Sequence, residues 1–256
     1  AFFAALCGAP FAMGLPTAPA YAGEAAAQEQ TLAIHGQYTG VVQGVGSFAS
    51  PYAGENSLDP NQTRMTNDVT LYLGLRPWKG AEIWVNPEVD QGFGLSNTLG
   101  AAGFPSAEAY KVGKENPYFK LPRAFLRQTV ALGGASVTLD AANNQLRQIT
   151  SANRLVVTLG KFAVNDVFDT NRFAHDPKSD FLNWSLVDTG GFDYAANAWG
   201  FTMGGSAELY YGAWTLRAGL FNLSKVPNQP SLEIDFSQNE ILLEIEHRHT
   251  PVSYTH

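Results

Sequence analysis

The chain has 256 residues, of which 23 are acidic, 16 are basic and one is a cysteine, and its net charge is −7. This length accommodates one large domain or two small ones, and the acidic balance excludes a typical nucleic-acid-binding protein, which carries clustered basic residues. Charged residues make up 15% of the chain, whereas soluble globular domains contain roughly 25%. The composition also excludes a disordered or disulfide-stapled chain.

The first 22 residues carry no charge, and Ala20-Tyr21-Ala22 matches the small-x-small pattern of a signal-peptide cleavage site. We therefore expect residues 1–22 to be the remainder of a signal peptide that directs export. A membrane-spanning or buried helix is the weaker interpretation, because the segment is short and three prolines interrupt it. Cleavage would remove Cys7 and leave a protein without thiols.

Apolar and polar side chains alternate over segments of about ten residues, as in strands that separate an apolar surface from a polar one. Between residues 67 and 76, for example, Val69 and Leu71 share one face, whereas Asp68, Thr70 and Tyr72 share the other. No run of 18 apolar residues follows the signal segment, so a transmembrane helix is not expected. About eight strands are predicted, at 34–43, 67–76, 81–90, 123–132, 154–160, 199–211, 213–223 and 240–249.

The predicted connections alternate in length. Residues 76–80 and 211–213 form tight links, whereas 47–63, 91–122, 166–198 and 224–239 are long and irregular. Short turns on one rim and long loops on the other are typical of an outer-membrane β-barrel, and such loops count against a compact soluble domain. The alternative fold is a soluble β-sandwich, whose strands also alternate but whose apolar faces are internal.

Several separated segments carry a resemblance to a known family. They are GFPSAEAYKVG at 103–113, PYFKLPR at 117–123, DTNRFAHDPKSDFLNW at 169–184, AWTLRAGLF at 213–221 and EIEHR at 244–248. Together they resemble the carbohydrate-selective porin family of Gram-negative outer membranes, over roughly residues 30–249. The resemblance implies an all-β, transmembrane antiparallel β-barrel in the bacterial outer membrane that passes sugars; some relatives take up manganese.

The resemblance departs from the family pattern at the end of the chain. Family members are longer, with more strands after EIEHR and an aromatic C-terminal residue, whereas residues 251–256 do not look like the next strand of the family. Eight strands close into a barrel that side chains nearly fill, and a solute channel takes about 16–18. We therefore expect residues 23–250 to be the N-terminal part of a larger barrel of 16–18 strands, incomplete at its C-terminus, and 251–256 to be a non-native-looking tail.

A porin needs a polar lumen and a constriction built by an infolded loop rather than a catalytic group, so we expect neither enzymatic activity nor a cofactor. Arg123 and Arg127 share one strand face, and we place them in the lumen because an arginine facing lipid at mid-membrane depth costs roughly 2–4 kcal/mol. The polar cluster at 166–180 is expected to fold into the pore, with Arg172 and Lys178 facing the solute. The expected pore-lining residues are Arg123, Arg127, Arg172, Lys178, Arg217, Glu82, Glu88, Asp169 and Asp176.

Such a lining suits neutral polyols, because guanidinium groups can donate to vicinal hydroxyls and aromatic rings can stack on sugars. The alternative role of these charges is to pair across the wall and keep the lumen hydrated. A divalent cation such as Mn²⁺ is the alternative solute, with Asp169, His175, Asp176 and Asp180 as candidate ligands, although interleaved basic residues favour salt bridges there.

A hypothesis of another class is a soluble periplasmic β-sandwich that binds a ligand. No hydrolase elbow, P-loop or Rossmann fingerprint is present. The partners that the porin interpretation implies are outer-membrane lipid and a small polar solute, a sugar or a divalent cation. The sequence leaves open which solute passes and whether the protein is a homo-oligomer.

Overall fold

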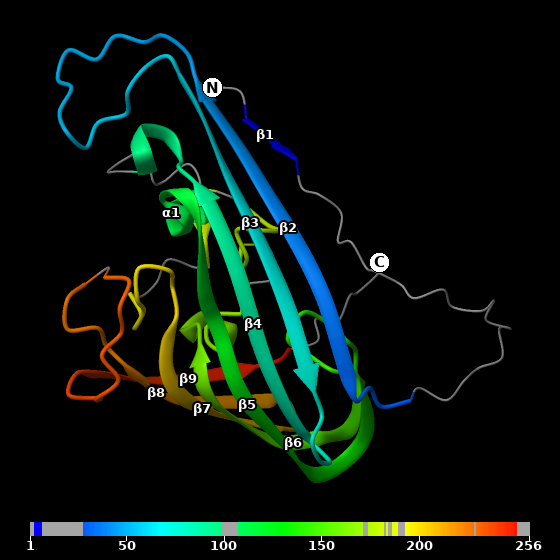
Figure 1. Ribbon diagram of the computed structural model, residues 1–256. Coiled ribbons are helices and arrows are strands. Elements are labelled where there is room, and N and C mark those ends of the chain that lie inside the picture. Colours follow the sequence, from blue (N-terminus) through cyan, green and yellow to red (C-terminus); the bar gives the residue numbers. More distant parts are fainter. Residues whose placement is uncertain are drawn as a thin grey trace, which may run out of the picture.

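The computed structural model describes residues 3–6, 28–98, 107–170, 174–181, 183, 186–188, 193–227 and 229–249. In this part of the chain, nine strands form a single sheet in sequence order, and every neighbouring pair is antiparallel (Figure 1). The strands are β1 (Phe3–Leu6), β2 (Leu32–Val45), β3 (Gln62–Leu75), β4 (Ala81–Gly92), β5 (Lys114–Leu139), β6 (Gln148–Phe162), β7 (Thr202–Tyr211), β8 (Trp214–Asn222) and β9 (Asn239–His247). The predicted all-β antiparallel fold is confirmed, and β2–β9 are the eight predicted strands; the sheet is not closed within the described residues.

Most of the predicted signal segment, 1–2 and 7–22, lies outside the described residues, as does the predicted tail at 251–256. The export signal and the domain boundaries therefore stay predictions. Among the described residues, no helix is long and apolar enough to cross a membrane.

Short and long connections alternate between the two rims of the sheet. The short ones are 76–80, 140–147 and 212–213, and the long ones are 46–61, 93–113, 163–201 and 223–238. Gly80 closes the tight turn between β3 and β4 with φ +76°, and an added Cβ there would lie 2.3 Å from the carbonyl oxygen of Thr129. The carbonyl oxygen of Gly80 accepts a hydrogen bond of 2.7 Å from the Thr129 backbone N–H. Because the two backbones approach this closely, only glycine fits at this position.

The polar face of the sheet is buried and its apolar face is exposed, which is the reverse of the arrangement in a soluble protein. On β3, Asp68 and Thr70 are each 1% exposed, whereas Leu71 and Leu73, on the other face, are 43% and 37% exposed. The same alternation continues along β4 and β8, where Ile83 and Leu216 are exposed beside buried polar neighbours. A β-sandwich buries its apolar faces, so this arrangement does not support that alternative. It suits a wall with lipid outside and a polar interior.

A β-bulge between β4 and β5 changes which side chains of β5 face the interior. Asn86 pairs with Arg123 and Glu88 pairs with Lys120, so three steps along β5 oppose two along β4. Strict alternation would point Lys120 away from the face that holds Arg123, and the bulge brings both inward. Pro122 lies in the bulge, where no ladder hydrogen bond is lost. The prediction of an irregular loop over 91–122 is therefore wrong for residues 114–122, which belong to β5.

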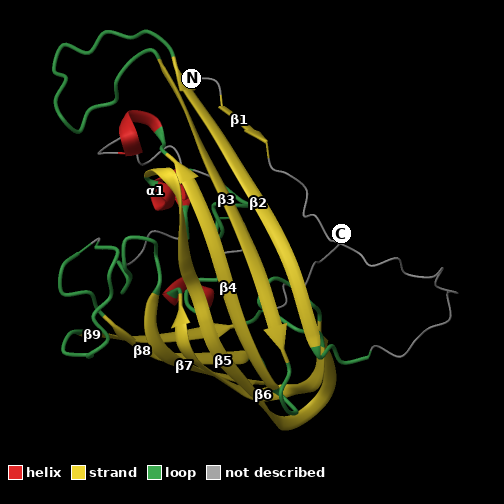
Figure 2. Cartoon of the chain, in the orientation of Figure 1, coloured by secondary structure: helices red, strands yellow, loops and turns green. Residues whose placement is uncertain are grey.

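The helical elements lie on the inner side of the sheet. α1 (Ala107–Val112) packs against β3 and β4, and the 3₁₀ turn η1 (Leu95–Thr98) packs against β2 and β3; Figure 2 shows α1 beside β4. A further turn, η3 (Val164–Asp166), directly follows β6.

An apolar cluster fills part of the interior. The buried residues in it are Ala33, Tyr72, Trp84, Phe125, Leu146, Phe162, Val164, Val167, Phe168, Ala195 and Phe221. The ring of Phe221 on β8 meets those of Phe162 and Phe168 edge to face, with centroids 5.5 and 5.9 Å apart. Because Val164, Val167 and Phe168 follow β6, the start of the β6–β7 connection is packed against the inner face of the sheet.

Candidate functional site

The β6–β7 connection is tied to β5 by a bidentate ion pair. Nε of Arg123 donates to Asp166 at 2.7 Å and Nη2 donates at 2.6 Å, and Asp166 also accepts the backbone N–H of Ala163 at 3.0 Å. Burial acts to raise the pKa of Asp166, but the Arg123 guanidinium and these hydrogen bonds outweigh it, and the pKa is lowered from its ordinary value. Both side chains are thus fixed as charged groups on the inner face.

A lysine of the same connection reaches across to β3 and β4. Nζ of Lys178 lies 2.9 Å from both carboxylate oxygens of Asp68, and 2.9 Å from Glu88 and from the Thr70 hydroxyl. The carboxylate of Glu108 on α1 lies 3.8 Å away. Burial acts to lower the pKa of Lys178, but the surrounding carboxylates prevail and raise that pKa well above its ordinary value.

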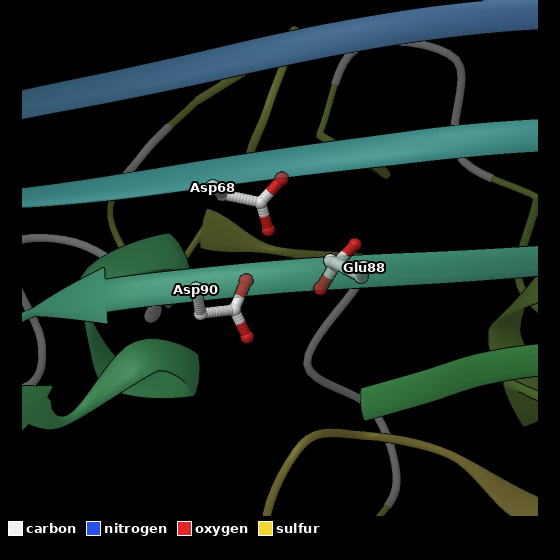
Figure 3. Close-up of side chains that lie close together, drawn as sticks. All are labelled: Asp68, Glu88 and Asp90. Carbon is white, nitrogen blue, oxygen red and sulfur yellow. The ribbon is translucent and has the colours of Figure 1, made fainter. Parts of the chain in front are cut away.

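A second lysine completes this network from β5. Nζ of Lys120 lies 2.8 Å from Glu88 and 2.6 Å from Asp90, and all three side chains are buried. Figure 3 shows the carboxylates of Asp68, Glu88 and Asp90 close together on adjacent strands. Their oxygen atoms come within 4.8 Å of one another, a spacing that could hold a metal ion. Two ammonium groups already bind these carboxylates, however, so the arrangement is an ion-pair network.

The four residues considered as metal ligands from the sequence have other contacts. Asp180 accepts the backbone N–H groups of His175 and Asp176, each at 3.0 Å, as a turn residue does. His175 Nδ1 lies 3.0 Å from Asp188, and this hydrogen bond raises the pKa of His175 above its ordinary value. The backbone N–H of Asp169 donates to a carboxylate of β9 at 2.9 Å. Among the described residues, no three of these four bring ligand atoms within 4.8 Å of one another.

Arg127 and Glu82 meet at the opposite end of the inner face. Nη1 of Arg127 donates to the carbonyl of Asn144 at 2.8 Å and lies 3.6 Å from Glu82. Glu82 is fully buried and accepts hydrogen bonds from Trp84 Nε1 at 2.9 Å and from the backbone N–H of Leu146 at 3.2 Å. Its carboxylate is therefore covered by protein groups.

A third cluster of charged side chains lies on β7, β8 and β9. Arg217 on β8 contacts Glu208 on β7 at 3.3 Å and Glu246 on β9 at 3.0 Å, and it also donates to Glu244. The guanidinium of this buried arginine thus links strands on both sides of β8, as paired charges on a polar inner wall do.

Within the part of the chain that the structure describes, two cavities open on the inner face. The first, of about 330 Å³, is lined by Tyr72, Arg123, Phe125, Arg127, Asn143, Asn144, Gln145, Ala163, Asn165, Asp166, His175, Asp176, Pro177 and Phe201. The second, of about 420 Å³, is lined by Arg127, Thr129, Thr138, Leu139, Asp140, Gln145, Gln148, Arg154, Val156, Asp166, Val167, Thr170, Glu208, Tyr210 and Arg217. Arginines, carboxylates and aromatic rings therefore line both cavities.

The model of the carbohydrate-selective porin, OprB family, matches residues 55–252. The chain belongs to this family. A solved structure titled "High pH structure of Pseudomonas putida OprB" is similar, with a TM-score of 0.50 and 16% sequence identity. The match covers 81% of this chain and 44% of that one, so the chain spans less than half the length of the porin it resembles. Curated protein sequences show no match.

Membership confirms the resemblance drawn from the loop motifs, and at this level of identity the solved structure supports the fold alone. The family consists of outer-membrane transport channels rather than enzymes. Seven of the nine predicted pore-lining residues fall into two groups. Arg123, Arg127, Asp176 and Arg217 line the cavities, whereas Glu82, Glu88 and Lys178 lie on the inner side in buried pairs. Asp169 contacts β9 through its backbone N–H, and Arg172 lies outside the described residues.

The pore-lining residues selected from the sequence leave out several charged residues that the structure places on the inner side, although Asp166 begins the polar cluster at 166–180 that was expected to fold into the pore. They are Asp68, Asp90, Glu108, Lys120 and Asp166. The alternation of apolar and polar side chains is enough to identify Asp68 and Asp90, because each lies on the face of its strand that was predicted to be polar. Lys120 was hidden by the bulge, and Glu108 and Asp166 lie on connections where no periodicity operates.

Proposed function

We propose that this chain forms part of the wall and constriction of an outer-membrane porin through which sugars or other small polar solutes diffuse passively. The observation that carries the proposal is the inner cavity of about 330 Å³, where Arg123 and Arg127 stand beside the rings of Tyr72, Phe125 and Phe201. Guanidinium groups donate to sugar hydroxyls and aromatic rings pack on the apolar faces of a sugar ring. The exposed apolar outer face supports the membrane location.

The β6–β7 connection is the proposed constriction loop. Three ion pairs support this role, because Asp166 pairs with Arg123, and Lys178 pairs with both Asp68 and Glu88 on the inner face. A segment held by partly buried charge pairs keeps a defined position in a hydrated lumen, and it can therefore select solutes by size.

One observation favours the divalent-cation alternative. The network around Lys178 and Lys120 contains the carboxylates of Asp68, Glu88, Asp90 and Glu108, so carboxylates outnumber ammonium groups. An excess of negative charge on a pore wall raises the local concentration of cations.

Conductance of the purified full-length protein in planar bilayers tests the proposal. We expect open channels that glucose or a larger sugar blocks, and weaker block in Arg123→Ala and Arg127→Ala, with Arg248→Ala as a control outside the cavity. Unchanged block by sugar in both variants would show that these arginines do not bind the sugar in the channel. A reversal potential in a MnCl₂ gradient that shows strong cation selectivity, without sugar block, would favour the alternative solute. Fractionation of the protein with soluble periplasm would refute a porin.

A further inference from the structure

The connection between β5 and β6 (140–147) belongs to the rim where the other turns are short, and its residues 144–146 pack into the interior whereas 140–143 are exposed. Ala142 and Gln145 close a tight turn through two backbone hydrogen bonds of 3.0 and 3.1 Å. Asn144, at its tip, has φ +60°, a conformation that asparagine tolerates better than most residues. Leu146 is fully buried in the interior apolar cluster with Trp84. A turn that lay along the rim would leave this leucine exposed.

Glu82 holds this turn in place from β4. Its Oε1 accepts from the Gln145 side-chain amide at 3.2 Å, and its Oε2 accepts from the Leu146 backbone N–H at 3.2 Å. Arg127 donates to the carbonyl of Asn144 at 2.8 Å from the neighbouring strand β5. Since Glu82 is fully buried, its carboxylate contacts the turn and cannot contact a passing solute.

A second set of contacts supports the same connection from Arg76, directly after β3, and from Gln30, before β2. Nη2 of Arg76 donates to the carbonyl of Arg147 at 3.0 Å, and its Nε donates to the carbonyl of Gln30 at 2.9 Å. The backbone N–H of Gln30 donates to Arg147 at 2.9 Å. Residues more than 100 positions apart in sequence are thereby joined across the inner side of the sheet at this rim.

The turn stands between the two inner cavities. Arg127, Gln145 and Asp166 are the residues that line both of them. Gln145 comes from the β5–β6 connection and Asp166 from the β6–β7 connection, which enters from the opposite rim. A solute that moves from one cavity to the other therefore passes these side chains.

We propose that the β5–β6 connection is a second constriction element, in which Gln145 determines solute size and Glu82 is a positioning residue that acts through the turn. The inference rests on the proposed porin function. The two connections enter from opposite rims and line the same two cavities, so the narrow section is built by both, and the Gln145 side chain sets part of its width.

Two substitutions of Gln145 test this inference in opposite directions. Gln145→Ala shortens the side chain at the partition, and Gln145→Trp enlarges it. Both keep the Leu146 backbone N–H that binds Glu82. We expect single-channel conductance and the largest sugar that swells proteoliposomes to increase in Gln145→Ala and to decrease in Gln145→Trp, each conductance by about twofold. Equal values in both variants and the unaltered protein would overturn the inference.

Glu82→Ala tests the positioning role, because it removes both acceptors of the turn. We expect a larger and noisier conductance and a higher size limit. Asp235→Ala is the control, since it removes a carboxylate that contacts Lys225 and Ser237 and not the turn. Heat-modifiable migration on gels shows whether each variant folds. If Glu82→Ala does not fold, the conductances of Gln145→Ala and Gln145→Trp test the inference. Channels with an unchanged size limit refute this inference alone, whereas the absence of any channel in the unaltered protein refutes the proposed function as well.

Discussion

Replacing Lys178 by methionine removes the ammonium group that binds the β6–β7 connection to β3 and β4. Methionine keeps the length and apolar character of the side chain, so the change is confined largely to the charge. In the unaltered protein, Nζ lies 2.9 Å from Asp68, Thr70 and Glu88, and the side chain is 13% exposed. The substitution therefore leaves buried carboxylates with Lys120 as their remaining cation in this network.

The expected cost follows from the burial of these groups. Removing one partner of a buried pair destabilises proteins by about 3–5 kcal/mol, because the other charge is left uncompensated. Water can enter a hydrated interior, so we take the lower limit of about 3 kcal/mol, which corresponds to a shift of about 100-fold in the equilibrium between docked and undocked connection. The cost falls on this segment and leaves the strand ladder intact.

Hydrogen exchange measured by mass spectrometry reports this equilibrium directly. The amides of His175 and Asp176, which donate to Asp180, are expected to exchange about 100-fold faster in Lys178→Met, whereas those of β3 stay protected. Lys225→Met is the matched control, because its ion pair with Asp235 is exposed and exposed pairs contribute little to stability.

The double variant Lys178→Met with Glu88→Gln is expected to recover part of the protection, because it removes one uncompensated charge. Exchange in Lys178→Met that stays within a few-fold of the unaltered protein and equals that of Lys225→Met would refute the reasoning. The connection would then be held by its apolar contacts alone.

Three further predictions concern other parts of the chain. The His175–Asp188 hydrogen bond raises the pKa of His175 above its ordinary value of about 6.5. The stabilisation that this contact gives to the connection should be complete below that pH and lost as the pH rises through the raised pKa. A pH series of local hydrogen exchange checks this, and a pH dependence that persists in His175→Gln would contradict it. Leu71→Arg places a charge on the exposed apolar face and should destabilise the folded protein in vesicles by about 2–4 kcal/mol in denaturant titrations, unless that face contacts water instead of lipid. Gly74→Val should lower the unfolding temperature, since an added Cβ would lie 2.5 Å from the Trp84 ring; an unchanged temperature would show that the ring moves aside at little cost.

Local periodicity accounts for what the sequence predicted well. Alternation at 67–76 placed Thr70 and Tyr72 on one face and Leu71 on the other, and the structure has the same division. Arg123 and Arg127 were assigned to the inner face from the cost of placing arginine in lipid, and both line the inner cavities. These features depend on residues two or four positions apart on one strand, so the chain alone is enough to predict them.

Periodicity failed where the backbone leaves regular geometry. Lys120 faces inward because a bulge at Pro122 shifts the register, and a bulge depends on the partner strand as well as on its own residues. The infolded turn around Asn144 was likewise not expected, although two adjacent asparagines mark a turn. Its inward position depends on the carboxylate of Glu82, more than 60 residues away in sequence.

The sequence by itself determined the class of the fold and the family, because alternation, connection length and loop motifs are properties of contiguous residues. Only the tertiary structure decided which charges meet. Whether Lys178 faces a solute or neutralises Asp68 and Glu88 depends on where the β6–β7 connection packs. That packing depends on a balance between the attraction of charges from distant segments and the cost of removing those charges from water. The low charge content seen at the outset thus reflects an outer face with almost no charge, whereas most of the charges that the chain does carry on its inner side are paired.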